Sequence, residues 1–130
     1  MLLMILLALL LLLFQVFMPG YYLTQQVGPT AQMGPRDDLP APSMALGRAR
    51  RALANLQETL PIFLVLALLA IMLGEQGWLS LVGAALYLLG RASHVVCYMA
   101  GLSPWRSISF STALLGLLLM VLTIVPHIWS

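Results

Sequence analysis

Four long apolar stretches, separated by very few charged residues, constrain this chain more than any other feature. No charge occurs before Arg36, between Glu58 and Glu75, between Glu75 and Arg91, or after Arg106. Only 8% of the residues are charged and 62% are hydrophobic. Soluble domains have about 25% charged residues, so this chain cannot cover a water-facing surface. The sequence therefore predicts an integral membrane protein.

Each apolar stretch is long enough to cross a bilayer, which takes about 20 residues. We predict an all-α membrane protein, a single domain over residues 1–130 built as a four-transmembrane-helix bundle. The expected helices cover residues 2–27, 43–73, 78–100 and 106–128. A signal peptide would begin with basic residues and end at a small-residue cleavage pattern, and neither is present. We therefore expect the first helix to be retained.

The connections between these helices predict the orientation of the chain. The first connection, residues 28–42, holds four prolines and is expected to be a loop. Residues 74–77 and 101–104 are expected to be short turns. Five of the six arginines belong to the side of the first and third connections, and Arg91 lies within reach of it. Because loops rich in basic residues remain in the cytoplasm, we expect the first and third connections, loops 1 and 3, to be cytoplasmic. Both termini are then expected outside.

Polar residues inside the second and third helices follow one face of each. The polar residues are 3, 4 and 3 positions apart in the second helix, and 4, 3 and 4 positions apart in the third. Because successive residues of a helix are rotated by about 100°, each set lies in one stripe along its helix. Ionisable residues in membrane spans usually face a bundle interior or a wet cavity. The stripes consist of Arg48, Arg51, Asn55 and Glu58, and of Tyr87, Arg91, His94 and Tyr98. We predict that the two stripes together form a binding site.

Structural roles are the alternative for individual members of the stripes. Arg48 and Arg50 lie near the membrane edge, where arginine side chains commonly extend to lipid headgroups. Arg51 and Glu58, two turns apart on one helix, are spaced for a structural ion pair bridged by Asn55, and such pairs also occur between helices. The deeper position of Arg91 favours a binding role for the set as a whole.

The side chains of the stripes indicate which ligand they suit. Guanidinium groups bind carboxylates and phosphates through paired hydrogen bonds, and one carboxylate suits an ammonium group. We expect a zwitterionic, carboxylate-rich small molecule at the cytoplasmic membrane edge, with apolar helix faces for a lipophilic second substrate. No metal is expected, because the chain has one cysteine and its two histidines lie toward opposite faces. The net charge of +2 gives no reason to expect nucleic acid.

Several motifs resemble those of a known family. Residues 51–63, RALANLQETLPIF, resemble the R-x-x-x-N-x-x-E and P-x-F signature of the MAPEG family, the membrane-associated proteins of eicosanoid and glutathione metabolism. Residues 90–98, GRASHVVCY, and 104–107, PWRS, are similar to the microsomal prostaglandin E synthase branch. Residues 34–40, GPRDDLP, resemble a loop of bacterial members. The resemblance covers nearly the whole chain and implies a bacterial-type member, which we expect in the bacterial inner membrane.

The resemblance implies a homotrimer in membrane lipid, with glutathione as cosubstrate between neighbouring subunits. It also implies transferase, peroxidase or isomerase activity on a lipophilic electrophile. By position, Arg106 would stabilise the glutathione thiolate, and Ser107 would be an alternative hydrogen-bond donor to the sulfur. A free thiol has a pKa near 8.5, and an adjacent arginine favours the thiolate. The glutathione-binding residues would be Arg48, Arg51, Asn55, Glu58, Arg91, His94 and Tyr98.

Two other function classes remain open. A non-catalytic membrane scaffold, or an orphan binder of a small anion or lipid, would not need Arg106 or Ser107. A small multidrug transporter would need a titratable acid at mid-membrane, usually in the first helix, and that helix has none. Glu58 lies beside arginines that would keep it ionised. Of these three function classes, we expect the glutathione-dependent enzyme.

Overall fold

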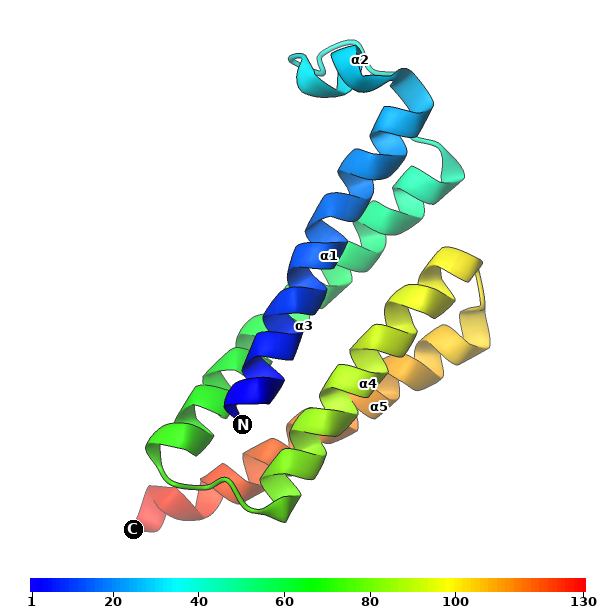
Figure 1. Cartoon of the computed structure of the whole chain (residues 1–130). Helices are drawn as coiled ribbons and strands as arrows, with labels where there is room; N and C mark the ends of the chain where they lie inside the picture. The colour runs from blue at the N-terminus through cyan, green and yellow to red at the C-terminus, as the bar shows by residue number, and fades with distance from the viewer.

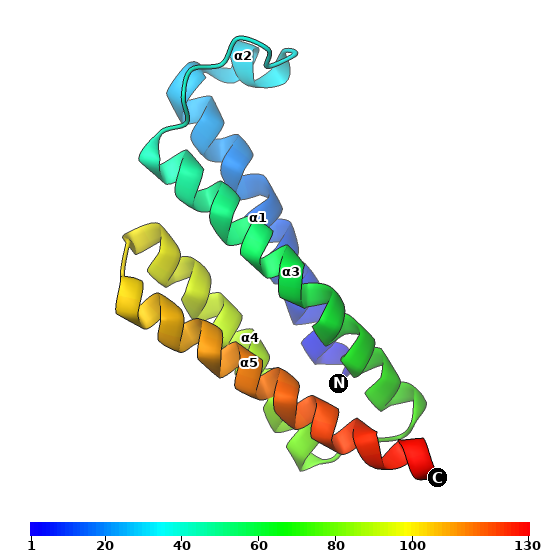
Figure 2. The same cartoon turned by 180° about the vertical axis from the view of Figure 1, so that it is seen from behind.

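The computed structural model describes all residues, 1–130, and consists of four long helices that run up and down in a bundle (Figure 1). All four are long and apolar enough to cross a membrane. They are α1 (Leu2–Val27), α3 (Met44–Met72), α4 (Trp78–Ala100) and α5 (Ser103–Ile124). Both termini lie toward the same end of the bundle (Figures 1 and 2). The predicted helical class and the four predicted spans are therefore confirmed.

The second helix is one residue shorter at each end than predicted, and the larger differences from the predicted boundaries all involve proline. The first connection, predicted as a loop, contains the short helix α2 (Pro29–Met33). Proline is tolerated in the first helical turn, where its missing N–H has no helical acceptor. For the same reason α5 begins at Ser103 and includes Pro104, three residues before the predicted start. Pro126 cannot continue the α-helical hydrogen bonds, and a 3₁₀ helix, η1 (Val125–Trp129), ends the chain instead.

Helices α4 and α5 pack closely because small residues face each other between them. A Cβ atom placed on Gly90 would lie 2.6 Å from the backbone nitrogen of Ala113, and Gly83 and Gly116 oppose each other in the same way. Helix α1 lies beside α3 along its length (Figure 2). The close α4–α5 contact brings the last turns of α4 next to the first turns of α5, where the predicted site residues lie.

The apolar core joins the two helix pairs toward the end of the bundle where α3 ends and α4 begins. Phe63 of α3 stacks on Tyr87 of α4, with ring centroids 4.5 Å apart. The hydroxyl groups of Tyr87 and Thr59 lie 3.0 Å apart in a hydrogen bond. Ile5 and Ala8 of α1 belong to the same core. Tyr87, the first member of its predicted stripe, thus belongs to the core. Because the core holds the helix pairs together near one end, polar residues are left to connect them near the other.

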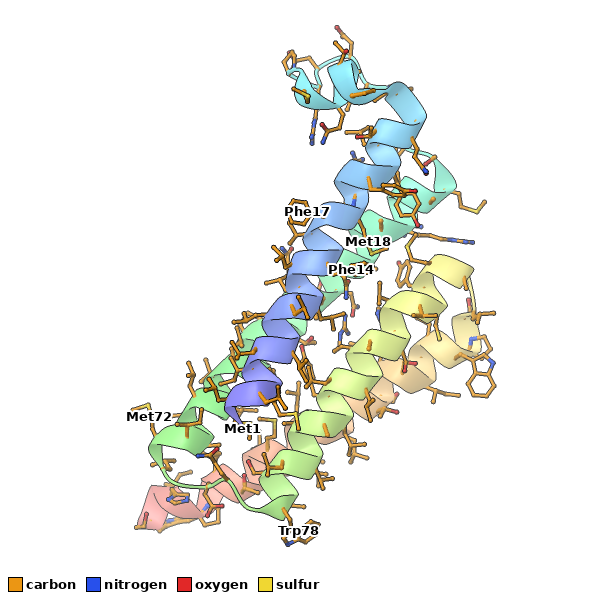
Figure 3. The ribbon with its side chains drawn as sticks, viewed as in Figure 1. Met1, Phe14, Phe17, Met18, Met72 and Trp78 are labelled. Carbon is orange, nitrogen blue, oxygen red and sulfur yellow. The ribbon has the colours of Figure 1, made fainter.

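The outer surface of the bundle is apolar, as a lipid environment requires. Phe14 and Phe17 of α1 are exposed along its length, and Trp78 is exposed at the start of α4 (Figure 3). Trp105 and Trp129 are also exposed near helix ends, where membrane-interface tryptophans are typically found.

Candidate functional site

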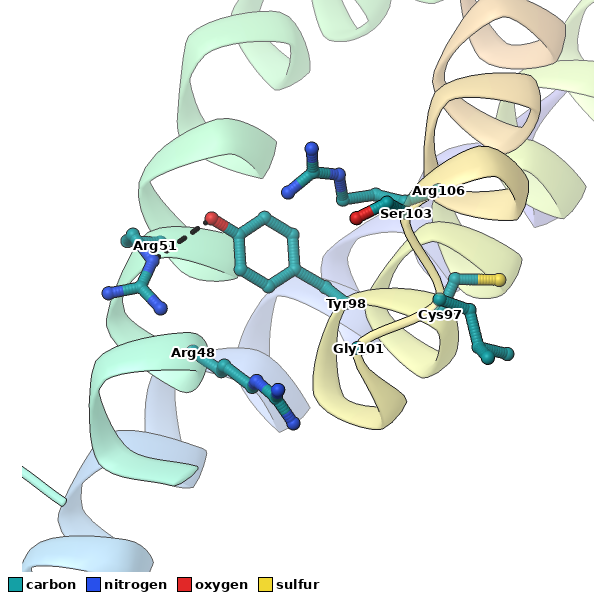
Figure 4. Close-up of a pocket in the computed structure, with 8 residues that line it drawn as sticks. Arg48, Arg51, Cys97, Tyr98, Gly101, Ser103 and Arg106 are labelled. Atoms are coloured by element: carbon teal, nitrogen blue, oxygen red, sulfur yellow. Dashed lines mark hydrogen bonds between the residues drawn. The ribbon is translucent and has the colours of Figure 1, made fainter. Parts of the chain in front are cut away.

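Three arginines line one cavity at the end of the bundle where α3 begins, α4 ends and α5 begins, which we name the arginine end. The cavity has a volume of about 190 Å³. Its lining comprises Arg48, Arg51, Arg106, Tyr98, Cys97, Gly101, Leu102 and Ser103 (Figure 4). The one ion pair in the chain joins His127 to Glu75. No carboxylate therefore lies within 4.0 Å of an arginine nitrogen. The three guanidinium groups are therefore available to an anionic ligand.

Tyr98 lies between two of these arginines. Arg51 Nε donates a hydrogen bond to Tyr98 Oη over 3.1 Å. On the other side, the Arg106 guanidinium carbon lies 5.0 Å from the centroid of the Tyr98 ring, within the range of a cation–π contact. Figure 4 shows the ring between the two side chains. One tyrosine of α4 thus positions an arginine from α3 and another from α5.

A second cavity, of about 380 Å³, lies deeper along α5 and shares Tyr98 and Arg106 with the first. Together the two volumes fall within the roughly 300–1,000 Å³ typical of small-molecule sites. The second cavity is lined by Asn55, His94, Tyr98, Arg106, Ser107, Phe110 and Ser111. Both predicted catalytic residues, Arg106 and Ser107, therefore face the same space as residues from each predicted stripe.

Arg91 and His94 are both buried, and of the two only His94 lines the second cavity. Arg91 is 0% exposed, and its Nη1 donates a hydrogen bond of 2.7 Å to Asn55 Oδ1. Its Nε and Nη2 have no hydrogen-bond partner, and neither has Nδ1 of His94. The Arg91 guanidinium carbon also lies 6.0 Å from the ring centroid of Phe110. The Asn55–Arg91 and Arg51–Tyr98 bonds show that the two predicted stripes face each other.

Arg48 also stabilises the end of α4. Its Nη1 donates to the carbonyl oxygen of Met99 over 3.0 Å, a terminal carbonyl of the kind that cationic side chains favour. Gly101 ends α4 in the left-handed region, with φ of 73°. A Cβ atom on Gly101 would lie 2.8 Å from Nη2 of Arg48. Gly101 thus suits this position through its backbone conformation, and a side chain there would displace the end of Arg48.

Comparison with protein families identifies the chain. A model of the MAPEG family matches residues 1–125. The chain belongs to the MAPEG family. With its four apolar helices, it is a multi-pass membrane protein. Comparison with curated proteins and with solved structures found no match.

The charged residue Glu58 of the MAPEG-like signature lies outside both cavities. Glu58 is exposed on α3 and forms neither an ion pair nor a hydrogen bond. The alternative Arg51–Glu58 ion pair is not formed, because Arg51 bonds to Tyr98 on the neighbouring helix. Arg50 is also exposed and lines neither cavity, as expected for an arginine that faces headgroups.

Among the buried polar residues that the sequence analysis missed, the largest is Gln15 of α1. It is 1% exposed, and neither of its amide atoms has a hydrogen-bond partner. A signal for it was present, because Gln15 is the one polar side chain among the first 20 residues. Amides in an apolar membrane helix commonly bond to neighbouring helices.

Proposed function

We propose that this MAPEG member is a glutathione-dependent membrane enzyme of the transferase, peroxidase or isomerase type, of the bacterial kind that resembles microsomal prostaglandin E synthases. The observation that carries the proposal is the group of three guanidinium side chains around Tyr98 with no carboxylate partner. Glutathione at neutral pH brings two carboxylates to such a group and one ammonium for an acidic residue. Membership of a family that includes glutathione transferases and related enzymes supports the same activity.

The deeper cavity suits the sulfur of glutathione. Arg106 and Ser107 both line it, so a positive charge and a hydroxyl donor are available at one point. The positive charge of Arg106 would stabilise the thiolate relative to the thiol. In conjugation, the thiolate sulfur attacks an electrophilic carbon of the lipophilic substrate and forms a C–S bond. The leaving group departs with the electron pair of the bond that breaks.

The position of Glu58 supports a homotrimer in which neighbouring subunits complete the site. Glu58 lies near the middle of α3, in a helix that is apolar enough to span a membrane, yet its side chain is exposed in the single chain. A carboxylate facing lipid at this depth is costly, and such residues normally face protein or a wet cavity. We infer that a neighbouring subunit covers it and that Glu58 receives the glutathione ammonium there. Native mass spectrometry in detergent should give three chains per particle.

The arginine end is proposed to face the cytoplasm of a bacterial inner membrane, with the positive-inside rule as support. A reporter fused after Ser130, at the opposite end of the bundle, should be active only outside the cytoplasm. Cytoplasmic activity of the reporter would reject this orientation.

The test of the activity is turnover of 1-chloro-2,4-dinitrobenzene with glutathione by the purified protein. The Arg106→Ala variant should lose about 100-fold or more of the rate, the range for removing one electrostatic stabiliser of a developing charge. Arg50→Ala is the matched control, because it removes the same charge outside both cavities. No turnover, together with no glutathione-dependent rise in melting temperature, would overturn the enzyme. That result would favour the alternative function, a non-catalytic membrane scaffold or an orphan binder of a small anion or lipid.

A further inference from the structure

Gln15 is an amide buried inside the bundle with no bonding partner. It is 1% exposed, and both Oε1 and Nε2 lack a hydrogen bond. Ile5, Ala8 and Leu23, the other buried residues of α1, are all apolar. Leaving both atoms of an amide unbonded in an apolar interior is unfavourable, and buried side-chain polar groups are nearly always paired. We therefore expect the amide of Gln15 to have a hydrogen-bond partner on a neighbouring helix.

The packing of α1 on α3 places Gln15 at the depth of Asn55. Gln26 at the other end of α1 accepts a hydrogen bond from the backbone nitrogen of Ser43, which fixes how the two antiparallel helices align. Gln15 precedes Gln26 by eleven residues, or about 16 Å of helix. The same length of α3 after Ser43 ends at Ala54, next to Asn55.

The packing of α1 on α4 gives the same depth independently. One apolar groove lies between these helices, which run in the same direction, and Phe14 and Ala92 are the last residues of α1 and α4 that line it. Gln15 follows Phe14 and Arg91 precedes Ala92 in the chain. Gln15, Asn55 and Arg91 therefore lie at one level on three helices that pack together.

The unbonded atoms at this level are chemically complementary. Arg91 is fully buried and donates only through Nη1, to Asn55, while its Nε and Nη2 have no acceptor. Gln15 Oε1 is an acceptor with no donor. A buried guanidinium with unmet donors is unfavourable, and a carboxamide acceptor at the same depth would satisfy it.

We propose that Gln15 is a positioning residue for the site: its carboxamide accepts a hydrogen bond from the free edge of Arg91, directly or across one water. Arg91 in turn holds Asn55 at the wall of the deeper cavity. Gln15 touches neither cavity and acts only through Arg91. Its effect on glutathione rests on the proposed function, whereas the contact with Arg91 does not.

The contact is tested by the sign of the change in melting temperature without glutathione. Methionine has nearly the length of glutamine but no amide. If Gln15 is an unpaired amide, Gln15→Met should stabilise the protein. If it pairs with Arg91, Gln15→Met should lower the melting temperature by a few degrees and Gln15→Glu should restore it, because a carboxylate is a stronger acceptor for a guanidinium. Leu11→Met, one turn earlier on α1, controls for methionine itself.

A double-mutant comparison identifies the partner. In an Arg91→Met background, Gln15→Met should no longer lower the melting temperature, because the unmet donors have gone. A stabilising Gln15→Met together with a destabilising Gln15→Glu would overturn the contact even if the Arg91 variant fails to fold.

The positioning role is tested by the kinetics of the same variants. Gln15→Met should raise the KM for glutathione on the order of tenfold, the value of one charge-assisted hydrogen bond, with a smaller change in kcat. Gln15→Glu should recover most of this loss. An unchanged KM with a lowered melting temperature would reduce Gln15 to a structural residue and overturn the positioning role. Absence of turnover in the unmodified protein would overturn the proposed function, while the thermal shifts decide the Gln15–Arg91 contact by themselves.

Discussion

At the arginine end, three guanidinium groups share one cavity with no carboxylate among them, whereas at the opposite end the acidic side chain has a partner within the chain. There, Glu75 of the α3–α4 connection lies 3.3 Å from Nε2 of His127 in η1. Both side chains are partly exposed, as expected at a membrane surface. The difference indicates that one end is closed within the chain, while the other retains positive charge for something outside it.

The two ends also differ in how the helix pairs are joined. At the opposite end, a connection of five residues, 73–77, links α3 directly to α4 (Figure 1). At the arginine end no backbone connects α3 to α4. Side chains do so instead, through the Arg51–Tyr98, Asn55–Arg91 and Arg48–Met99 hydrogen bonds. Substitutions at the arginine end should therefore change both packing and ligand binding, and those at the opposite end only stability.

The largest expected effect concerns Arg106 and pH. Besides lowering the rate, Arg106→Ala should move the half-maximal rate of conjugation to higher pH, because loss of a nearby positive charge raises the pKa of the bound thiol toward about 8.5. Rates between pH 6 and 9 would measure this. The profile of Arg50→Ala should match that of the unmodified protein. An unshifted profile for Arg106→Ala would place the thiolate away from Arg106.

The next largest effect is expected on stability, when three glycines are each replaced by alanine. Gly101→Ala introduces both a left-handed alanine and a Cβ atom 2.8 Å from Arg48, and should lower the free energy of unfolding by about 2 kcal/mol. Gly74→Ala has the same backbone strain but nothing within 4 Å, and Gly77→Ala has neither. Chemical unfolding in detergent should rank the losses as Gly101, then Gly74, then Gly77. Equal losses at Gly101 and Gly74 would mean that Arg48 does not occupy this space.

A smaller effect is expected from the Tyr98 hydroxyl. Tyr98→Phe removes the acceptor for Arg51 Nε and leaves the ring beneath Arg106. The loss of one hydrogen bond is worth about 1 kcal/mol, or roughly a fivefold rise in the KM for glutathione. Steady-state kinetics would measure it. A loss as large as that of Arg106→Ala would show that the hydroxyl takes part in the chemistry.

The smallest effect is expected at the opposite end. Glu75→Gln removes one partner of an exposed pair, and such pairs contribute about 0–1 kcal/mol. The melting temperature should fall slightly and the rate of conjugation should stay unchanged. A clear loss of rate would contradict the comparison, because it would couple the two ends.

Much of the fold could be predicted because helix formation in lipid depends on local properties. Backbone groups in a bilayer must bond within their own helix, so long apolar stretches alone predict spans. The misplaced boundaries lie at Pro29, Pro104 and Pro126, where a proline can either begin or interrupt a helix. The two stripes were visible for the same reason, because the 3.6-residue repeat places their members on one face.

The sequence by itself therefore determined the membrane class, the four helices and the residues that share a helix face. The tertiary structure alone decided which of these residues meet. Arg51 bonds to Tyr98 and not to Glu58, Arg48 binds the end of α4, and Gln15 lies at the depth of Arg91. The physical reason is that a long polar side chain reaches acceptors on its own helix and on its neighbours equally well. The distance and alignment between helices, such as the α1–α3 alignment at the Gln26–Ser43 hydrogen bond, select among them.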